Sequence, residues 1–280
     1  MNEADKTRDA VSRAYAKAVS DTSTKACCSS EEMKGVAAKM AGYDPNELLT
    51  VAPSAVANSF GCGNPLAFSE VGPGDVVVDL GSGAGIDILL AGRKVGPTGR
   101  VIGVDMTDEM IERARENVAA SGLDNVEVRK GLIEDLPVES GSVDWLISNC
   151  VINLSPEKDR VFAEIARVLK PGGRMLVSDI VVEDLPAWAR ENAALYSSCI
   201  AGAISEKDYL GGLRRAGLVD VEVRERLVYD SGQLRAFVDS EVSELACCSS
   251  AEGSAPLGQA AQELAGKIWS AKVYARKPAP

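Results

Sequence analysis

From residue 75 onward, short apolar runs alternate with amphipathic stretches along the chain. The apolar runs predict strands at residues 76–80, 101–105, 126–129, 143–148 and 174–179. Strands that alternate with helices are typical of a parallel, doubly wound α/β sheet. We therefore predict a Rossmann-like α/β fold for this part of the chain.

Two helices between these strands have clear start and stop signals. Thr107 is predicted to cap a helix that ends at Gly122 and has Met110 and Ala114 on its apolar face. Ser155-Pro156 predicts the start of a second helix, and Pro171-Gly172-Gly173 its end. Both helices fit the predicted crossovers between parallel strands.

Segments on either side of this core have weaker patterns. Residues 3–19 and 31–42 are each predicted to form an amphipathic helix, and a loop with several Pro and Asn residues follows as far as Pro65. We expect an N-terminal helical segment with a cysteine-bearing loop over 1–65.

After the core, a mostly helical insertion is predicted over residues 184–217. Two further strands, near 219–223 and 268–275, are expected to complete the sheet, and Ser249–Gly258 reads as a loop. We expect a core domain over 66–180 and an insertion with a C-terminal α+β extension over 181–280.

Glycines follow the first predicted strand in a pattern that points to a cofactor. Residues 79–85 read D-x-G-x-G-x-G, and the second strand ends at Asp105, 20 residues beyond Gly85. In open α/β sheets, this geometry places a nucleoside across the carboxyl ends of two strands, with the acid on the ribose hydroxyls. A dinucleotide fingerprint would have a third glycine where this chain has Ile86. The pattern instead resembles the first motif of class I S-adenosylmethionine-dependent methyltransferases.

This resemblance implies a set of cofactor contacts. Asp79 and the glycines would hold the methionine portion, Asp105 the ribose, and Ile133 and Glu134 the adenine. The expected cofactor-binding residues are Asp79, Gly81, Gly83, Gly85, Asp105, Met106, Ile133, Glu134 and Asn149.

Charge and composition exclude several classes of partner. The net charge of −11 and sequence pI near 4.7 disfavour nucleic acid and anionic membranes, which such a surface repels. The sequence contains no apolar run of about 18 residues, as a membrane span needs, and the charged start predicts no signal peptide. We therefore expect a cytoplasmic protein. Because the chain has no histidine, Ser-His and Cys-His nucleophiles and His-bearing metal sites are excluded.

Seven cysteines carry the remaining candidate chemistry, namely Cys27, Cys28, Cys62, Cys150, Cys199, Cys247 and Cys248. An odd number in a reduced compartment argues against a disulfide framework. Cys62 lies between two glycines in a loop, Cys150 follows the fourth strand, and Cys199 lies in the insertion. We expect these three thiols, from separate segments, to converge on one pocket.

Three converging thiolates suit a soft, thiophilic centre. Structural zinc normally has four ligands in Cys-x-x-Cys knuckles, which this chain lacks. Trivalent arsenic binds three sulfurs and keeps a nucleophilic lone pair. At this point the sequence resembles the arsenite methyltransferase family in four segments, which are Gly61–Pro65, Gly81–Asp87, Ser148–Leu154 and Ser270–Pro278.

The family resemblance implies roles for the cysteines. Cys62, Cys150 and Cys199 would be the ligands of the As(III) substrate, and Cys27 or Cys28 would exchange disulfides with Cys62. A thiol reductant such as glutathione or thioredoxin is then implied, with arsenite and methylated trivalent arsenicals as substrates and S-adenosylmethionine as co-substrate. The insertion is expected to cover the substrate. The predicted function is arsenite methylation for arsenic detoxification.

Two alternatives remain open from the residues alone. A small-molecule methyltransferase acting on a quinone or sterol would share the core but would not need Cys62 and Cys199. A thiol protein that sequesters metalloids would share the cysteines but not Asp79 or Asp105. The repeat of Ala-Cys-Cys-Ser-Ser at 26–30 and 246–250 marks Cys247 and Cys248 as a candidate metalloid-acquiring or reducing dithiol.

Overall fold

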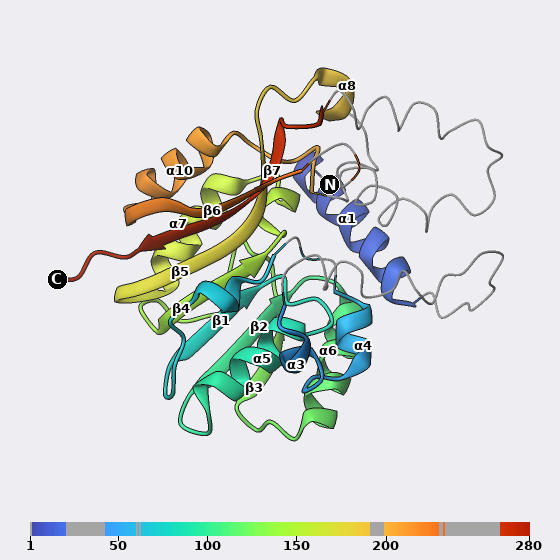
Figure 1. Ribbon diagram of the computed structural model, residues 1–280, viewed down its shortest axis with the longest axis vertical. Coiled ribbons are helices and arrows are strands. Elements are labelled where there is room, and N and C mark those ends of the chain that lie inside the picture. The colour runs from blue at the N-terminus through green and yellow to red at the C-terminus, as the bar shows by residue number, and fades with distance from the viewer. Residues whose placement is uncertain are drawn as a thin grey trace.

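The described residues form a seven-stranded, mostly parallel sheet. The structure is a computed structural model that describes residues 2–20, 43–59, 61, 63–190, 199–229, 232 and 264–280. The strands are β1 (Val76–Leu80), β2 (Arg100–Asp105), β3 (Val126–Lys130), β4 (Val143–Asn149), β5 (Leu169–Val182), β6 (Val219–Val228) and β7 (Ile268–Arg276). Their spatial order is β3-β2-β1-β4-β5-β7-β6, and β7 is antiparallel to both of its neighbours (Figure 1). The predicted α/β fold is confirmed.

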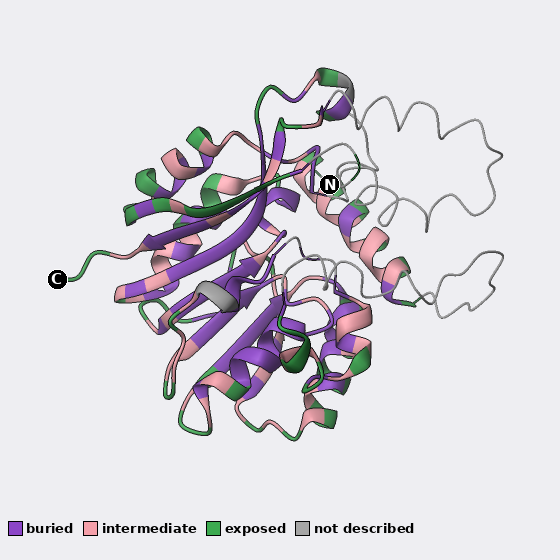
Figure 2. Ribbon diagram, in the orientation of Figure 1, coloured by how far each residue is buried: buried purple, intermediate pink, exposed green. Residues whose placement is uncertain are grey.

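Helices cover both faces of this sheet. They are α1 (Glu3–Ser20), α3 (Pro45–Leu48), α4 (Pro53–Ala57), η2 (Pro65–Phe68), α5 (Ile86–Val95), α6 (Asp108–Ser121), η3 (Ile152–Leu154), α7 (Lys158–Val168), α8 (Ala187–Arg190) and α10 (Glu206–Arg215). Apolar side chains of α5 and α6 join one core cluster, and those of α7 and α10 join another. The strands between them are largely buried (Figure 2).

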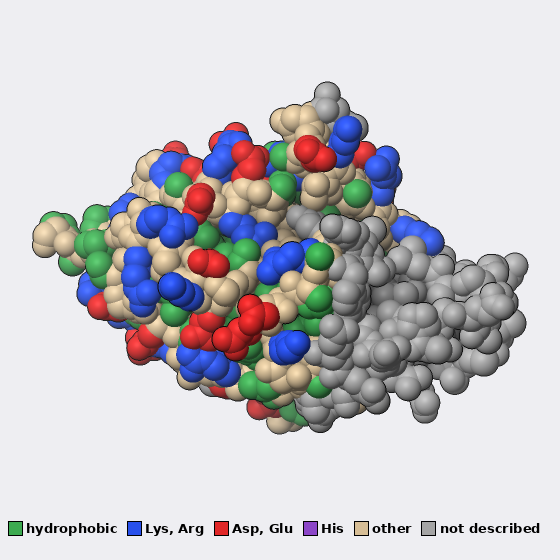
Figure 3. Space-filling model, turned by 90° about the horizontal axis from the view of Figure 1, so that it is seen from above, with side chains coloured by type: hydrophobic (Ala, Val, Ile, Leu, Met, Phe, Trp, Pro, Cys, Tyr) green, Lys and Arg blue, Asp and Glu red, His purple; other side chains and the backbone are tan. Residues whose placement is uncertain are grey.

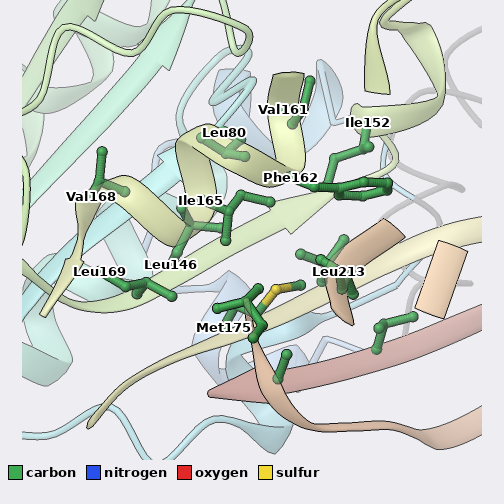
Figure 4. Packing of buried hydrophobic residues seen from close by; sticks show 14 of the residues in the cluster. Leu80, Leu146, Ile152, Val161, Phe162, Ile165, Val168, Leu169, Met175 and Leu213 are labelled. Carbon is green, nitrogen blue, oxygen red and sulfur yellow. The ribbon is translucent and has the colours of Figure 1, made fainter. Parts of the chain in front are cut away.

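The core under α7 shows how the helix pattern becomes packing. Val161, Phe162, Ile165 and Val168 project from one side of α7 onto the sheet (Figure 4). The Phe162 ring meets that of Tyr209, from α10, edge to face, with 5.2 Å between centroids. Burial of such side chains supplies about 1.5–3 kcal/mol each, so this contact joins α10 firmly to the domain.

The structure corrects both predicted ends of this helix. The helix begins at Lys158 rather than at Ser155-Pro156, because Ser155 Oγ accepts a hydrogen bond from Glu157 N and forms a turn first. It ends at Val168, and the Pro-Gly-Gly sequence lies inside β5. The backbone of Gly172 and Gly173 pairs with Lys277 near the C-terminal end, and this pairing draws the three residues into the strand.

The segment before the first strand also differs from the predicted loop. It contains α3, α4 and η2, and the first two begin with Pro45 and Pro53 at positions that suit proline. Asp44 caps α3 by accepting from Asn46 N at 2.7 Å. Short polar and proline-rich stretches give little periodic signal, which is why these brief helices were missed.

Helix α6 spans the predicted residues, with Gly122 in the left-handed conformation at its end. Thr107 occupies the N-cap position, but its side chain makes no capping bond and its Oγ1 donates to Ser12 Oγ of α1 at 3.2 Å. The predicted helix 31–42 and loop 249–258 lie outside the described residues. The predicted insertion holds α8 and α10.

On the surface, acidic and basic side chains are interspersed on the face seen from above (Figure 3). No helix among the described residues has the length and apolar character that a membrane crossing demands.

Candidate active site

A pocket lies at the carboxyl edge of the parallel strands. Its wall includes the turn after β1, the ends of β2 and β4, and residues Arg8, Val11 and Tyr15 of α1. Helix α1 lies beside this end of the sheet (Figure 1). Ligands of open α/β sheets bind at this edge, because the strand order reverses there between β1 and β4.

The glycine turn forms the floor of the pocket. Gly81, Gly83 and Gly85 all have positive φ, at 65°, 50° and 97°, which favours glycine. A Cβ on Gly81 would overlap the Val151 side chain, whereas a Cβ on Gly83 would meet nothing within 4 Å. Gly81 and Gly83 line the pocket. Gly85, predicted as a cofactor residue, is instead the N-cap of α5 and is not among the lining residues.

Asp105 lies at the end of β2 and lines the pocket as predicted. Its Oδ2 accepts from Gly83 N at 3.0 Å, and its Oδ1 accepts from Thr107 N at 2.9 Å. Burial raises the pKa of Asp105, and these backbone hydrogen bonds oppose the rise. Each oxygen keeps a lone pair, so the carboxylate can accept further hydrogen bonds from a ligand.

Asp79 lies beneath the pocket rather than on its wall. It is 2% exposed, and burial together with the charges of Asp87 and Asp105 raises its pKa well above the usual value. The acid on the wall is Asp87, which accepts from Tyr43 Oη at 2.9 and 3.0 Å. Burial raises the pKa of Asp87 to about 6. The predicted contact between Asp79 and the cofactor stays a prediction.

Four more of the predicted cofactor-binding residues line the pocket, namely Met106, Ile133, Glu134 and Asn149. Their contact with the cofactor stays a prediction. Glu134 is buried and accepts from Ser155 Oγ at 2.6 Å.

Arg8 of α1 also binds Glu134, with Nε donating to Oε1 at 3.1 Å, and pairs with Glu157 as well. Sequence reasoning missed Arg8, because its partners Glu134 and Glu157 lie 126 and 149 residues away along the chain. Asp87 could have been found, since it closes the glycine motif.

The residues of this pocket fit S-adenosylmethionine. Ser82 Oγ is buried on the wall and has no hydrogen-bond partner among the described residues, so a ligand can satisfy it. Gly83 leaves open space, and Asp105 and Glu134 offer acceptors for ribose and adenine. An amino-acid nucleoside matches this mixture of an apolar wall and few polar groups.

Two of the predicted cysteines are in contact, and one of them lies on the pocket wall. Cys150 follows β4 on the wall, and Cys199 Sγ donates to the Cys150 carbonyl oxygen at 2.7 Å. Both are 3% exposed and belong to the same apolar cluster. Both also have positive φ, 59° and 63°, an uncommon backbone conformation for a residue with a Cβ. Strained backbone of this kind gathers at functional sites.

The remaining cysteines cannot be placed. Cys27, Cys28, Cys62, Cys247 and Cys248 all lie outside the described residues. Within the described part of the chain, no three Cys, His, Asp or Glu residues form a metal-binding group. The predicted convergence of three thiols therefore stays a prediction. The described contact joins the Cys199 thiol to the backbone carbonyl of Cys150, whose own sulfur is in a disulfide.

Strand order, glycine turn and acidic strand ends together define a class I S-adenosylmethionine-dependent methyltransferase. A family model described as a methyltransferase domain matches residues 72–217. The solved arsenic(III) S-adenosylmethionine methyltransferase of Chlamydomonas reinhardtii is 31% identical, with a TM-score of 0.67, over 85% of this chain and 75% of that one. The chain belongs to the arsenite S-adenosylmethionine methyltransferase family.

Two curated relatives agree with this assignment. An arsenite methyltransferase of Halobacterium salinarum is 47% identical over 72% of this chain, and one of Aquipseudomonas alcaligenes is 38% identical over 80%. The chain spans only 52% of the first relative's length and 63% of the second's.

Proposed function

We propose that this protein transfers methyl groups from S-adenosylmethionine to trivalent arsenic that cysteine thiolates hold. One observation carries the proposal: Cys150 lies on the wall of the cofactor pocket, and the thiol of Cys199 lies against its carbonyl oxygen. A thiophilic substrate bound there would face the methyl donor.

S-adenosylmethionine supplies a methyl group on a positively charged sulfur, so the transfer needs no activated leaving group from the protein. The chain's task is then to orient the two reactants, which can supply about 7–11 kcal/mol of a barrier. Asp105 would accept hydrogen bonds from the ribose hydroxyls and Glu134 would lie against the adenine; that both residues line the pocket supports these roles. Asp87 offers a carboxylate for the methionine ammonium.

The metalloid side depends on thiolates. We propose Cys62, Cys150 and Cys199 as the three ligands, whose deprotonation on binding releases protons. Methyl transfer to the lone pair would formally oxidise arsenic from the trivalent to the pentavalent state. Two protein thiols, Cys62 and Cys27 or Cys28, would reduce it again by forming a disulfide, which glutathione or thioredoxin would then reduce by thiol–disulfide exchange. Because these thiols must stay reduced, we propose the cytoplasm as the compartment.

Arsenic speciation tests the proposal directly. The protein would be incubated with arsenite, S-adenosylmethionine and glutathione, and the methylated products separated. We expect Cys150→Ser to abolish every methylation step and Cys199→Ser nearly so, because a hydroxyl is a hard ligand that replaces sulfur poorly. Both variants should still bind S-adenosylmethionine, which controls for folding.

Other outcomes would identify the alternatives. Near-normal turnover of arsenite by either serine variant would contradict the proposal that cysteine thiolates hold the arsenic. Methylation of a quinone or sterol but not of arsenite would indicate a small-molecule methyltransferase. Tight arsenite binding without cofactor binding would indicate a sequestering protein.

A further inference from the structure

The side chain of Asn149 is joined to the backbone of Gly63, 86 residues away in the sequence. Asn149 Nδ2 donates to Gly63 O at 2.5 Å, and Gly63 N donates to Asn149 Oδ1 at 3.1 Å. The amide therefore satisfies both backbone groups of one residue, as a neighbouring strand would. Asn149 is the last residue of β4 and directly precedes Cys150.

The two glycines that flank position 62 are shaped for this contact. A Cβ on Gly61 would overlap the Asn149 amide, and a Cβ on Gly63 would lie 2.5 Å from Ser178 Oγ. Neither glycine has a positive φ, so the requirement for glycine is close approach and not backbone conformation. Asn149 and Ser178 are register partners at the ends of β4 and β5. Asn149 and Ser178 therefore contact the backbone of Gly61 and of Gly63 closely.

The amide of Asn149 has little capacity left for a ligand. One Nδ2 hydrogen is used by Gly63 O, and the other is shared by Tyr43 Oη at 3.0 Å and Asp87 Oδ2 at 3.5 Å. The chain's own groups thus use both donors of this side chain. Asn149 lines the cofactor pocket, but its strongest contacts face the glycine segment.

We infer that Asn149 is a positioning residue for the metalloid site, a role that rests on the proposed function. Its side chain holds the segment that carries Cys62, while its backbone leads directly into Cys150. One residue thereby sets the relation between two candidate ligands that are far apart in the sequence. Ligands of a three-coordinate site need fixed spacing, and supporting partners of metal ligands change affinity by about 10–100-fold when they are removed.

We call the pair of hydrogen bonds between the Asn149 side chain and the Gly63 backbone the clamp. Hydrogen exchange tests it without arsenic. In the wild-type protein, the Gly63 amide should be protected by its bond to Asn149 Oδ1. We expect Asn149→Ala to accelerate exchange at Gly63. Asn125→Ala is the matched control, because Asn125 is also half-buried and its amide holds the carbonyl oxygens of Gly92 and Gly96, at 2.9 and 2.8 Å. That control should leave Gly63 protected.

Arsenite titration and steady-state kinetics test the function of the clamp. We expect Asn149→Ala to raise the Kd for arsenite and its KM by about 10–100-fold. The KM for S-adenosylmethionine should rise less, because Asn149 also lines the cofactor pocket but only its weaker contact reaches Asp87. Asn149→Asp keeps the size of the side chain and loses the donor to Gly63 O. It should therefore also raise the constants for arsenite more than the KM for S-adenosylmethionine. Asn125→Ala should change neither constant.

Three outcomes decide the inference. A rise in the KM for S-adenosylmethionine alone would make Asn149 a cofactor contact and overturn it. Unchanged exchange at Gly63 in Asn149→Ala would also overturn it; Asn149→Asp keeps an acceptor for Gly63 N and is read by its kinetics alone. If wild-type protein binds no arsenite, the proposed function fails and the metalloid role with it, while the exchange result still establishes or refutes the clamp.

Discussion

Three acids lie at the cofactor pocket, of which Asp79 and Asp87 are buried and Asp105 is half-buried, and each has different hydrogen-bond partners. Asp105 accepts hydrogen bonds from backbone N–H groups, Asp87 accepts them from a tyrosine hydroxyl, and Asp79 is off the pocket wall but within range of both charges. Burial raises the pKa of all three. Because Asp105 combines a place on the wall with hydrogen bonds that favour its charged form, it is the acid best prepared to accept hydroxyl groups.

Asp105→Ala is expected to weaken S-adenosylmethionine binding by about one to two orders of magnitude, since charge-assisted hydrogen bonds contribute about 1.5–3 kcal/mol. Arsenite affinity should barely change. Calorimetric titration of both ligands would measure this. Unaltered cofactor affinity in the variant would refute the assignment of Asp105 to the ribose.

Another buried acid, Asp179, does not line the pocket, and its protonation contributes to stability. It is fully buried in β5, where it accepts from Asn153 Nδ2 at 2.8 Å and from Tyr209 Oη at 3.3 Å. Burial raises the pKa of Asp179 to about 7, against the opposing effect of hydrogen bonds and of Lys158. The folded state therefore holds this proton at pH values where the unfolded chain has lost it.

The raised pKa of Asp179 makes its contribution to stability depend on pH. As pH rises from about 4 to 7, the unfolded state gains stability by ionising Asp179 while the folded state does not. Asp179→Asn removes this loss, so its free energy of unfolding relative to wild type should increase between pH 5 and pH 8. Urea unfolding of both proteins at the two pH values measures the difference, and a constant difference would contradict the argument.

At the scale of elements, helix α1 contributes to the pocket wall although it precedes the first strand of the sheet by more than fifty residues. Arg8 is 13% exposed at its side chain and joins α1 to Glu134 and Glu157. Val11 and Tyr15 of the same helix complete the wall. The position of α1 over the pocket thus depends in part on one arginine that reaches a buried glutamate.

Arg8→Ala should lower the free energy of unfolding by about 1–3 kcal/mol, because Glu134 loses a charged partner while buried. Cofactor affinity should fall with it, since α1 forms part of the wall. Arg13→Ala is the matched control on the same helix, where Arg13 pairs with Asp9 and is 73% exposed, a pair expected to contribute at most about 1 kcal/mol. Equal effects of the two variants on urea unfolding and cofactor titration would argue against a role for Arg8.

At the scale of the whole molecule, the paired cysteines near the two ends of the sequence divide the proposed reaction into steps. Cys27→Ser combined with Cys28→Ser should spare binding and transfer to already methylated trivalent arsenic. It should block the first methylation or sustained turnover from arsenite, because the relay can no longer reduce the site. Rates with arsenite and with monomethyl trivalent arsenic measure this. Identical loss on both substrates would contradict the relay.

The second pair belongs to a different step. Replacing Cys247 and Cys248 by serine should reduce uptake of arsenite at low concentration and leave the maximal rate largely intact. Adjacent cysteines form a strained disulfide, so a shared metalloid or a distant partner suits them better. Kinetics unchanged at every arsenite concentration would reduce the repeated motif to coincidence.

Local pattern alone determined much of this protein. Apolar runs, together with residues that start and stop helices, predicted the parallel core. The glycine spacing and Asp105 predicted the cofactor. Both signals are local, because each strand and the turn that follows it are contiguous in sequence. The helix end predicted at Pro171-Gly172-Gly173 was wrong, because a contact distant in the sequence determines the structure of that segment. Pairing with Lys277 decided that segment, and a pairing partner a hundred residues away leaves no local signal.

Only the tertiary structure decided which polar groups face the pocket. It placed Asp79 below the wall and Asp87 on it, brought Arg8 of α1 to Glu134, and set the thiol of Cys199 against Cys150. It also joined Asn149 to Gly63. These contacts depend on the twist and order of the strands, which bring distant residues to one edge of the sheet, whereas sequence spacing records only neighbours along the chain.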